Sequence, residues 1–164
     1  VVGPPEPIEM IGRLIATGQM TIYKSSHAML NDFIESGAFD RRVRFLQEYY
    51  RQKRDYLCRR LLPLAEKGLK FHIPEGGLCL WCKLPDDVNE KKLFALCKQR
   101  GVLYMPGGVF FPYGYSGSGY IRLCFSSVSE QQIDRAVETL EIAMRHCKDS
   151  MERRISEAAL QFRR

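Results

Sequence analysis

The sequence predicts an α+β fold, in which a small, mostly antiparallel sheet is covered on one face by helices. Two patterns lead to this prediction. Long segments carry apolar residues every three or four positions, as on one side of a helix, and short segments alternate apolar with polar residues, as in half-buried strands. The expected order of elements is helix, long helix, hairpin, helix, strand, strand and helix.

The first part of the chain should be helical. Three prolines near the start are expected to prevent an early helix, so the first short helix is placed at residues 8–19. A second helix should cover residues 28–36, with Ser25 or Ser26 as its N-cap and Gly37 as its C-terminal stop.

Asp40 should cap a long amphipathic helix. Its apolar side is formed by Val43, Leu46, Tyr50, Leu57, Leu61 and Leu64. The same segment holds most of the basic residues behind the net charge of +6: Arg41, Arg42, Arg44, Arg51, Lys53, Arg54, Arg59 and Arg60. We interpret them as a solvated helix face rather than a nucleic-acid site, because no stacking aromatic residues are interleaved with them.

Three further segments should build the sheet. Residues 69–73 and 78–84 are expected to pair as a hairpin, and residues 102–105 should form a short strand after a helix from Asn89 to Gly101. Pro106, Gly107 and Gly108 then force a bend. A glycine-rich loop is expected at residues 113–119.

The strand over residues 120–125 has two unlike faces. Ile121, Leu123 and Phe125 should point to one side, whereas Tyr120, Arg122 and Cys124 should point to the other. After it, Ser129 and Gln132 form a capping box for the last long helix. The apolar side of that helix consists of Ile133, Val137, Leu140, Met144 and Cys147. The polar tail after Asp149 has weak helical spacing.

Composition limits the class of protein. A chain of 164 residues with 45% hydrophobic residues can bury one core. Because it has neither an apolar run of membrane-spanning length nor a signal peptide, we expect a cytoplasmic protein without a membrane partner. The start at Val1 rather than Met predicts a fragment of a longer protein. The six cysteines lack a disulfide-framework spacing and should be reduced.

Few residues indicate chemistry of their own. Cys79 and Cys82 match the CxxC pattern, but on a strand they would point to opposite faces, so we expect no metal site. The three histidines stand far from any recognisable nucleophile, and we assign no catalytic residue. Arg122 could grip a carboxylate with two parallel hydrogen bonds, although a structural ion pair is the favoured interpretation from the residues alone.

Three segments in order resemble aminotransferases of fold type I. They are Gly76-Gly77-Leu78-Cys79-Leu80-Trp81-Cys82-Lys83-Leu84-Pro85, Gly101-Val102 through Met105-Pro106-Gly107, and Tyr120-Ile121-Arg122-Leu123-Cys124-Phe125-Ser126. The resemblance reverses the interpretation of Arg122 and implies that it binds the carboxylate of an amino acid, with Pro106, Gly107 and Gly108 as a nearby loop.

The resemblance also implies a domain organisation. Residues 1–20 correspond to the end of the family's large cofactor domain and its linker, residues 21–147 to its small C-terminal domain, and residues 148–164 to a polar helical tail. The family's cofactor is pyridoxal 5'-phosphate, bound through a lysine and a phosphate cradle that should lie upstream of this chain. Lys24 lies beyond the place of that lysine and is rejected. We therefore expect the complete protein to bind the cofactor, and this chain to bind none and to be inactive.

Two functions remain open within the family. The sequence looks closest to transcriptional regulators of the MocR type in the GntR family, which sense an amino-acid effector, and this is the favoured interpretation. The alternative is an aminotransferase similar to the 2-aminoadipate and kynurenine enzymes, which transfers an amino group to a 2-oxo acid. Expected partners are the amino acid, the large domain of the same protein and a second copy in a homodimer. DNA would be contacted only through an N-terminal domain outside this chain.

Overall fold

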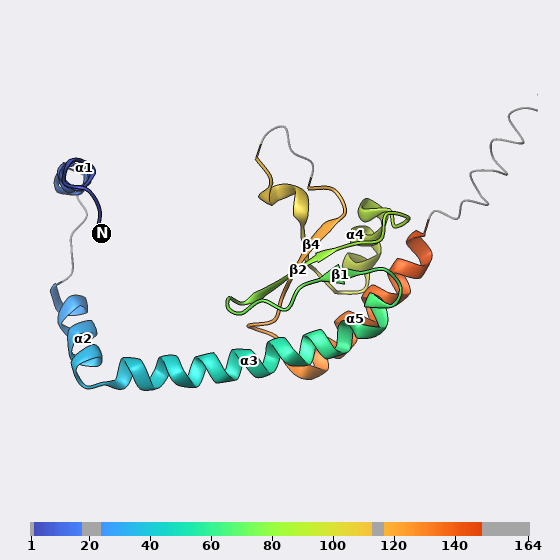
Figure 1. Cartoon of the computed structure of the whole chain (residues 1–164), viewed down its shortest axis with the longest axis horizontal. Helices are drawn as coiled ribbons and strands as arrows, with labels where there is room; N and C mark the ends of the chain where they lie inside the picture. Colours follow the sequence, from blue (N-terminus) through green and yellow to red (C-terminus); the bar gives the residue numbers. More distant parts are fainter. Residues whose placement is uncertain (1, 18–23, 113–116, 149–164) are drawn as a thin grey trace, which may run out of the picture. The chain divides into compact units, whose positions relative to one another are not determined.

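The computed structural model describes residues 2–17, 24–112 and 117–148. The chain divides into two compact units, with the boundary between Phe45 and Leu46. Unit 1 holds helices α1 (Pro5–Thr17) and α2 (Lys24–Glu35) and the start of α3 (Ala38–Ala65), and unit 2 holds the rest of α3 and the sheet (Figure 1). The domain boundaries at residues 20 and 147 remain predictions.

All three N-terminal helices begin earlier than predicted. α1 starts at Pro5. A proline is tolerated in the first turn of a helix, because the backbone N–H that it lacks would have no hydrogen-bond partner within the helix there. α2 starts at Lys24, ahead of the predicted serine cap. α3 starts at Ala38, so Asp40 lies within its first turn, where a carboxylate stabilises the helix dipole. Gly37 follows α2 with a φ of 68°, which confirms the predicted stop.

Unit 1 leaves its apolar side chains exposed. No residue of α1 is buried, and Met10 and Leu14 are both more than half exposed. The predicted apolar side of α2 is exposed as well, at Met29, Leu30, Phe33 and Ile34. Such apolar surface is typical of segments that pack against something else.

The apolar side of α3 is confirmed in unit 2, where Leu57, Leu61 and Leu64 are at most 5% exposed. The basic residues are less solvated than predicted. Lys53 Nζ donates to the carbonyl oxygens of Ser126, at 3.1 Å, and Val128, at 2.7 Å. These bonds tie α3 to the segment that leads into the last helix, so part of the positive charge is structural.

Four antiparallel strands form the sheet in the order β1-β2-β4-β3. They are β1 (Lys70–Phe71), β2 (Cys79–Lys83), β3 (Met105–Pro106) and β4 (Tyr120–Cys124). The pairing of β1 with β2 confirms the predicted hairpin. β4, the strand that carries Arg122, lies between β2 and β3. Every residue of β4 therefore pairs with at least one neighbouring strand.

Two strand boundaries were wrong. β1 ends at Phe71 rather than residue 73, and Ile73 is 60% exposed, because the chain turns away before it can pair further. The predicted strand at residues 102–105 is a strand only from Met105 onward. Tyr104, just before it, is 6% exposed and packs its ring edge-on against Phe94, so this segment is held by side-chain packing rather than by a ladder.

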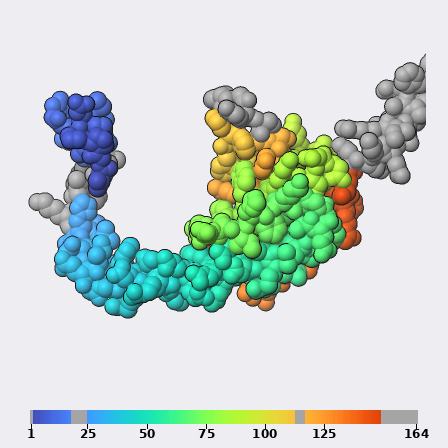
Figure 2. All heavy atoms as spheres, in the orientation of Figure 1, coloured from blue at the N-terminus to red at the C-terminus, as the bar shows by residue number. Residues whose placement is uncertain are grey.

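Helices cover the inner face of the sheet. α4 (Glu90–Gln99) begins after Asn89, whose side chain accepts from Lys92 N, and α5 (Glu130–Cys147) begins with the predicted Ser129–Gln132 capping box. With α3 they enclose a core that includes Leu57, Leu61, Leu64, Leu80, Cys82, Leu93, Cys97, Ile121, Ile133, Val137, Leu140 and Met144. The space-filling view shows the yellow atoms around η1 (Gly107–Phe110) at one edge of this unit (Figure 2).

The described residues contain no helix that is long and apolar enough to cross a membrane. Three predictions fall wholly or partly on residues that are not described: the end of the first helix, the glycine-rich loop at residues 113–119 and the tail after Asp149. The α+β class with a small antiparallel sheet is confirmed.

Candidate functional site

The sheet has an open face, opposite the helices. It carries the outward side chains of Cys79, Trp81, Lys83, Met105, Tyr120, Arg122 and Cys124. On β4, Ile121 is fully buried on the inner face while Cys124 is exposed, as the predicted alternation requires. The residue types on this face, with their aromatic rings, thiols and a guanidinium, set it apart from the aliphatic core.

Arg122 lies at the centre of the open face. Its Cα partners are Trp81 on β2 and Met105 on β3, so strands on both sides hold its backbone. Its Cζ lies 4.7 Å from the centroid of the Phe110 ring. The Nε atom is buried and has no hydrogen-bond partner among the described residues. A buried donor without a partner is costly, so an acceptor that reached this Nε would stabilise the site.

The described residues offer Arg122 no carboxylate within salt-bridge distance. The ion pairs of unit 2 lie elsewhere, such as Arg60 with Asp134 and Lys67 with Glu141. A structural ion pair was the alternative role for Arg122, and nothing in the described chain supplies its acidic partner. Its role in binding a carboxylate stays a prediction.

An aromatic cluster lies on the same face, and Phe110 connects it to Arg122. Trp81 stacks on Tyr120 with the ring centroids 5.6 Å apart, and meets Phe110 edge-on at 5.6 Å. Phe111 lies 6.2 Å from Trp81 and 5.7 Å from Tyr120. Phe110 thus joins this aromatic cluster to the guanidinium, and an apolar ring on one side of a cation strengthens its interaction with an anion.

The predicted loop residues position these rings. Pro106 is the last residue of β3, and η1 follows directly from Gly107. A Cβ atom on Gly107 would lie 2.4 Å from Tyr120 Cβ and 2.7 Å from the Tyr120 carbonyl oxygen. Gly107 is thus required for the loop to lie against β4, whereas Gly108 has open space around its Cα. This close approach brings Phe110 over Arg122.

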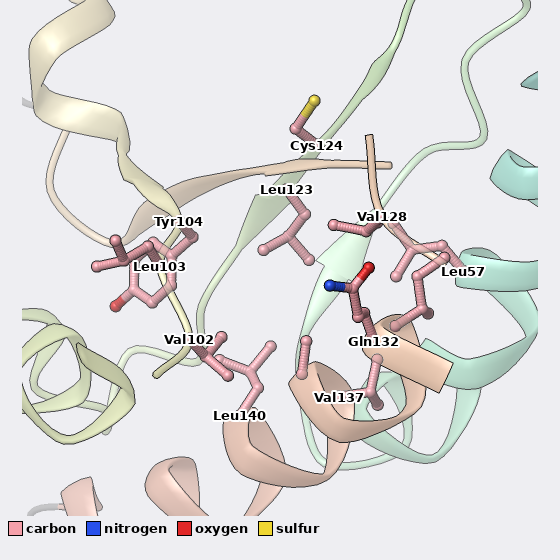
Figure 3. A pocket seen from close by; sticks show the side chains of 12 residues that line it. Leu57, Val102, Leu103, Tyr104, Leu123, Cys124, Val128, Gln132, Val137 and Leu140 are labelled. Atoms are coloured by element: carbon pink, nitrogen blue, oxygen red, sulfur yellow. The ribbon is translucent and has the colours of Figure 1, made fainter. Parts of the chain in front are cut away.

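Two hollows formed by the described residues lie near the sheet, and Arg122 lines neither of them. The smaller is a hollow of about 100 Å³ between α5, Leu123 and the segment before β3 (Figure 3). It is too small for an amino acid, since ligand pockets usually measure about 300–1,000 Å³. The larger, of about 780 Å³, is open and lies between the start of α4 and the η1 loop, with Pro106 and Gly108 in its lining.

The two cysteines of the CxxC pattern lie on opposite faces of β2, as the alternation of a strand predicts. Cys82 is fully buried, whereas Cys79 lies on the open face. Burial raises the pKa of Cys82 to about 12, so this thiol is inert. Among the described residues no group of histidines, cysteines and carboxylates could hold a metal ion.

Sequence reasoning missed the aromatic residues and the cysteine pair of the open face. Trp81 could have been placed there, because it lies between the inward positions Leu80 and Cys82 on one strand. Phe110 could not, since η1 is a single turn whose direction depends on packing against β4. The opposition of Cys79 and Cys124 follows from a register between strands that are distant in sequence.

The sequence matches the aminotransferase class I and II family over residues 14–140. The chain belongs to this family. Aromatic-amino-acid aminotransferase 1 of Thermococcus litoralis is 30% identical over 108 residues, which cover 66% of this chain and 26% of that protein. The mitochondrial kynurenine/alpha-aminoadipate aminotransferase of Rattus norvegicus is 31% identical over 98 residues, 57% of this chain and 22% of that protein.

A solved structure shows the same fold. The alpha-aminoadipate aminotransferase of Thermus thermophilus, in complex with N-(5'-phosphopyridoxyl)-L-leucine, matches with a TM-score of 0.78 at 23% identity. The match covers 89% of this chain and 37% of that structure. The chain thus spans between 22% and 37% of the length of these relatives.

Proposed function

We propose that this chain is the substrate-carboxylate-binding part of a pyridoxal-phosphate-dependent aminotransferase that acts on amino acids. The observation that carries the proposal is Arg122: a guanidinium on an inner strand, beside the Phe110 ring, with a buried Nε that has no partner among the described residues. Because the chain matches the aminotransferase family, transamination is the expected reaction. The arginine is the group that fits the carboxylate of the amino-acid substrate.

Arg122 would orient the substrate. A guanidinium presents a planar fork that matches the two oxygens of a carboxylate, and the backbone on both sides of it is held by neighbouring strands. The ring of Phe110 limits the directions in which the guanidinium can turn. Fixing the carboxylate also fixes the α carbon, from which a proton must be removed at a defined angle to the cofactor.

The described residues do not fit the cofactor end of the reaction. Lys83 lies on the open face beside Tyr120, but its Nζ is 3.5 Å from Asp86 and pairs with that carboxylate. Pyridoxal phosphate supplies an electron sink when bound, and its lysine and phosphate cradle belong, in this proposal, to the part of the relatives' length that this chain does not span. We assign no step of the cofactor chemistry to this chain.

The regulator interpretation gives way to the enzyme. The relatives described above are aminotransferases, and the resemblance to MocR-type regulators rests on sequence likeness in segments that the enzymes share. The substrate class that we propose is a 2-aminoadipate-like, kynurenine-like or aromatic amino acid, with a 2-oxo acid as acceptor. The support is the names of these relatives and the aromatic rings beside Arg122.

The proposal includes two partners. The exposed apolar sides of α1 and α2 are surfaces of the kind that pack against further protein. We propose that the large domain of the same protein and a second copy in a homodimer cover them. Cytoplasmic localisation is part of the same proposal.

The test is a transamination assay on the complete protein with pyridoxal phosphate supplied. Kynurenine, 2-aminoadipate and aromatic amino acids are offered with a 2-oxo acid, and kcat/KM is measured for each. Arg122→Lys keeps the charge but loses the fork, so kcat/KM should fall on the order of 10- to 100-fold, because hydrogen bonds to charged groups contribute about 1.5–3 kcal/mol. Arg135→Lys, exposed on α5, is the matched control and should leave the rate unchanged.

A second comparison isolates the carboxylate. Binding of each amino acid is compared with binding of the corresponding amine, which lacks the carboxylate, in unchanged protein and in Arg122→Lys. The preference for the amino acid should shrink in the variant. An unchanged preference would refute the role of Arg122. Amino-acid binding without any transamination, together with specific DNA binding by the complete protein, would restore the regulator interpretation.

A further inference from the structure

Two of the six cysteines lie side by side on the open face. Cys79 on β2 and Cys124 on β4 are Cα partners in the antiparallel ladder. Cys124 is exposed and Cys79 is partly exposed. The other four cysteines, Cys58, Cys82, Cys97 and Cys147, are buried in the core.

The register gives the pair the geometry of a cross-strand disulfide. Hydrogen-bonded and non-hydrogen-bonded pairs alternate along an antiparallel ladder. Leu84 N donates to Gly119 O at 2.7 Å at one end, and Phe125 N donates to Leu78 O at 3.1 Å at the other. The Cys79–Cys124 pair, next to the second of these bonds, is therefore of the non-hydrogen-bonded kind.

Side chains approach each other most closely in such pairs. Their Cα atoms are about 4.5 Å apart, within the range of about 4.4–6.8 Å that disulfides usually join. A disulfide between Cys79 and Cys124 would thus need little movement of the backbone. The pair also lies on the two inner strands of the sheet, which pair with each other along all five residues of each strand.

The two thiols differ in reactivity. A hydrogen bond with Ser126, whose Oγ lies 3.2 Å from Cys124 Sγ, lowers the pKa of Cys124, and a hydrogen bond with Cys79 and the charge of Arg122 add to the effect. Burial raises the pKa of Cys79, and its hydrogen bond with Cys124 raises it further. Since the thiolate is the reactive form, Cys124 should react first and Cys79 second.

We propose that Cys79 and Cys124 form a reversible thiol–disulfide site whose oxidant is a peroxide. The sulfur of Cys124 attacks one peroxide oxygen and the O–O bond breaks. Cys124 becomes a sulfenic acid, and the displaced oxygen leaves as water. Cys79 then attacks the resulting sulfenic acid, forms the S–S bond and releases a second water. Two thiols and one hydrogen peroxide thus give one disulfide and two waters, and a dithiol reductant reverses the reaction.

The site adjoins the proposed substrate contact. Cys124 lies two residues beyond Arg122 on the same face of β4, a spacing of about 6.5–7 Å along a strand. A solute that reaches Arg122 can therefore reach both thiols. Nothing in the chemistry of the pair requires transamination, so the proposal stands or falls independently of the function proposed above.

The test uses the full chain, reduced and then treated with an equimolar amount of hydrogen peroxide under native conditions. The intact mass should fall by two hydrogen atoms, and peptide mapping should join Cys79 to Cys124 while the four buried cysteines stay reduced. Dithiothreitol should restore the original mass. Cys79→Ser should stop at a sulfenic acid on Cys124, trapped by dimedone, and Cys124→Ser should slow oxidation of Cys79 by on the order of tenfold or more.

Several outcomes would overturn the proposal. One is over-oxidation of Cys124 in unmutated protein while Cys79 remains a thiol. Others are a disulfide that involves a buried cysteine or joins two chains, and equal rates of oxidation at all six positions. The mapping of unmutated protein decides the question even if a serine variant folds poorly.

Discussion

Gly107 offers a sharp test of how the loop is held against β4. In Gly107→Ala, the new Cβ would lie 2.4 Å from Tyr120 Cβ, 2.7 Å from the Tyr120 carbonyl oxygen and 2.9 Å from the Gly117 carbonyl oxygen. Carbon atoms pack best about 3.5–4.0 Å apart, so the loop or the strand must move by about 1 Å. Most of the obstructing atoms belong to backbone, and overpacking of this kind costs about 1–3 kcal/mol.

The assay is urea unfolding of the full chain, followed by the fluorescence of Trp81, its one tryptophan. With a slope of about 1–3 kcal/mol per molar urea, the midpoint should fall by on the order of 1 M. The native emission should also change, because the loop carries Phe110 and Phe111 against the Trp81 ring. Gly108→Ala is the matched control: nothing lies within 4 Å of its Cβ position, so stability should change by less than about 0.5 kcal/mol. Equal effects in the two variants would refute the close-approach argument.

Two further predictions concern stability, both measured by urea unfolding. Leu61→Ala, at a fully buried position of α3, should cost about 2–5 kcal/mol, whereas Leu62→Ala, 56% exposed on the same helix, should cost less than about 0.5 kcal/mol; similar losses would mean that α3 is not packed as described. Hydrogen bonds from Lys67 and then Arg145 hold the pKa of Glu141 below its ordinary value of 4.5. A carboxylate whose pKa is lower in the folded than in the unfolded protein stabilises the fold at a pH above its unfolded pKa. This stabilisation is lost as the pH falls through the folded-state pKa. Glu141→Gln should therefore destabilise the protein at neutral pH but not well below pH 4.5. A loss that is the same at every pH would contradict this.

Local patterns predicted most of the fold. The Ser129–Gln132 capping box, the stop at Gly37 and the two faces of the Arg122 strand depend on residues a few positions apart, and all are confirmed. Helix starts were less predictable, because several residue types are tolerated in a first turn. Pro5 illustrates this, since it begins the helix that it was expected to prevent.

The candidate site was only partly predictable, for a physical reason. Arg122 was found because alternation and a resemblance both point to it, but its neighbours come from β2 and from η1, which are distant in sequence. Register between strands is set by the hydrophobic pattern of the whole sheet and by turn lengths. The aromatic rings and the cysteine pair therefore emerge only once the strands are aligned.

One strand links the core to the proposed chemistry. Ile121 is fully buried on the inner face of β4, and Arg122, the next residue, points to the open face. Because neighbouring side chains on a strand point in opposite directions, the packing of Ile121 fixes the position and direction of Arg122. Because β4 pairs with β2 along its whole length and with β3 at Ile121 and Arg122, a shift of this strand would have to break ladder bonds as well as core contacts. A guanidinium placed in this way loses little entropy when it binds a carboxylate. The same rigidity keeps Cys79 and Cys124 opposed, so the substrate contact and the thiol pair depend on a single register.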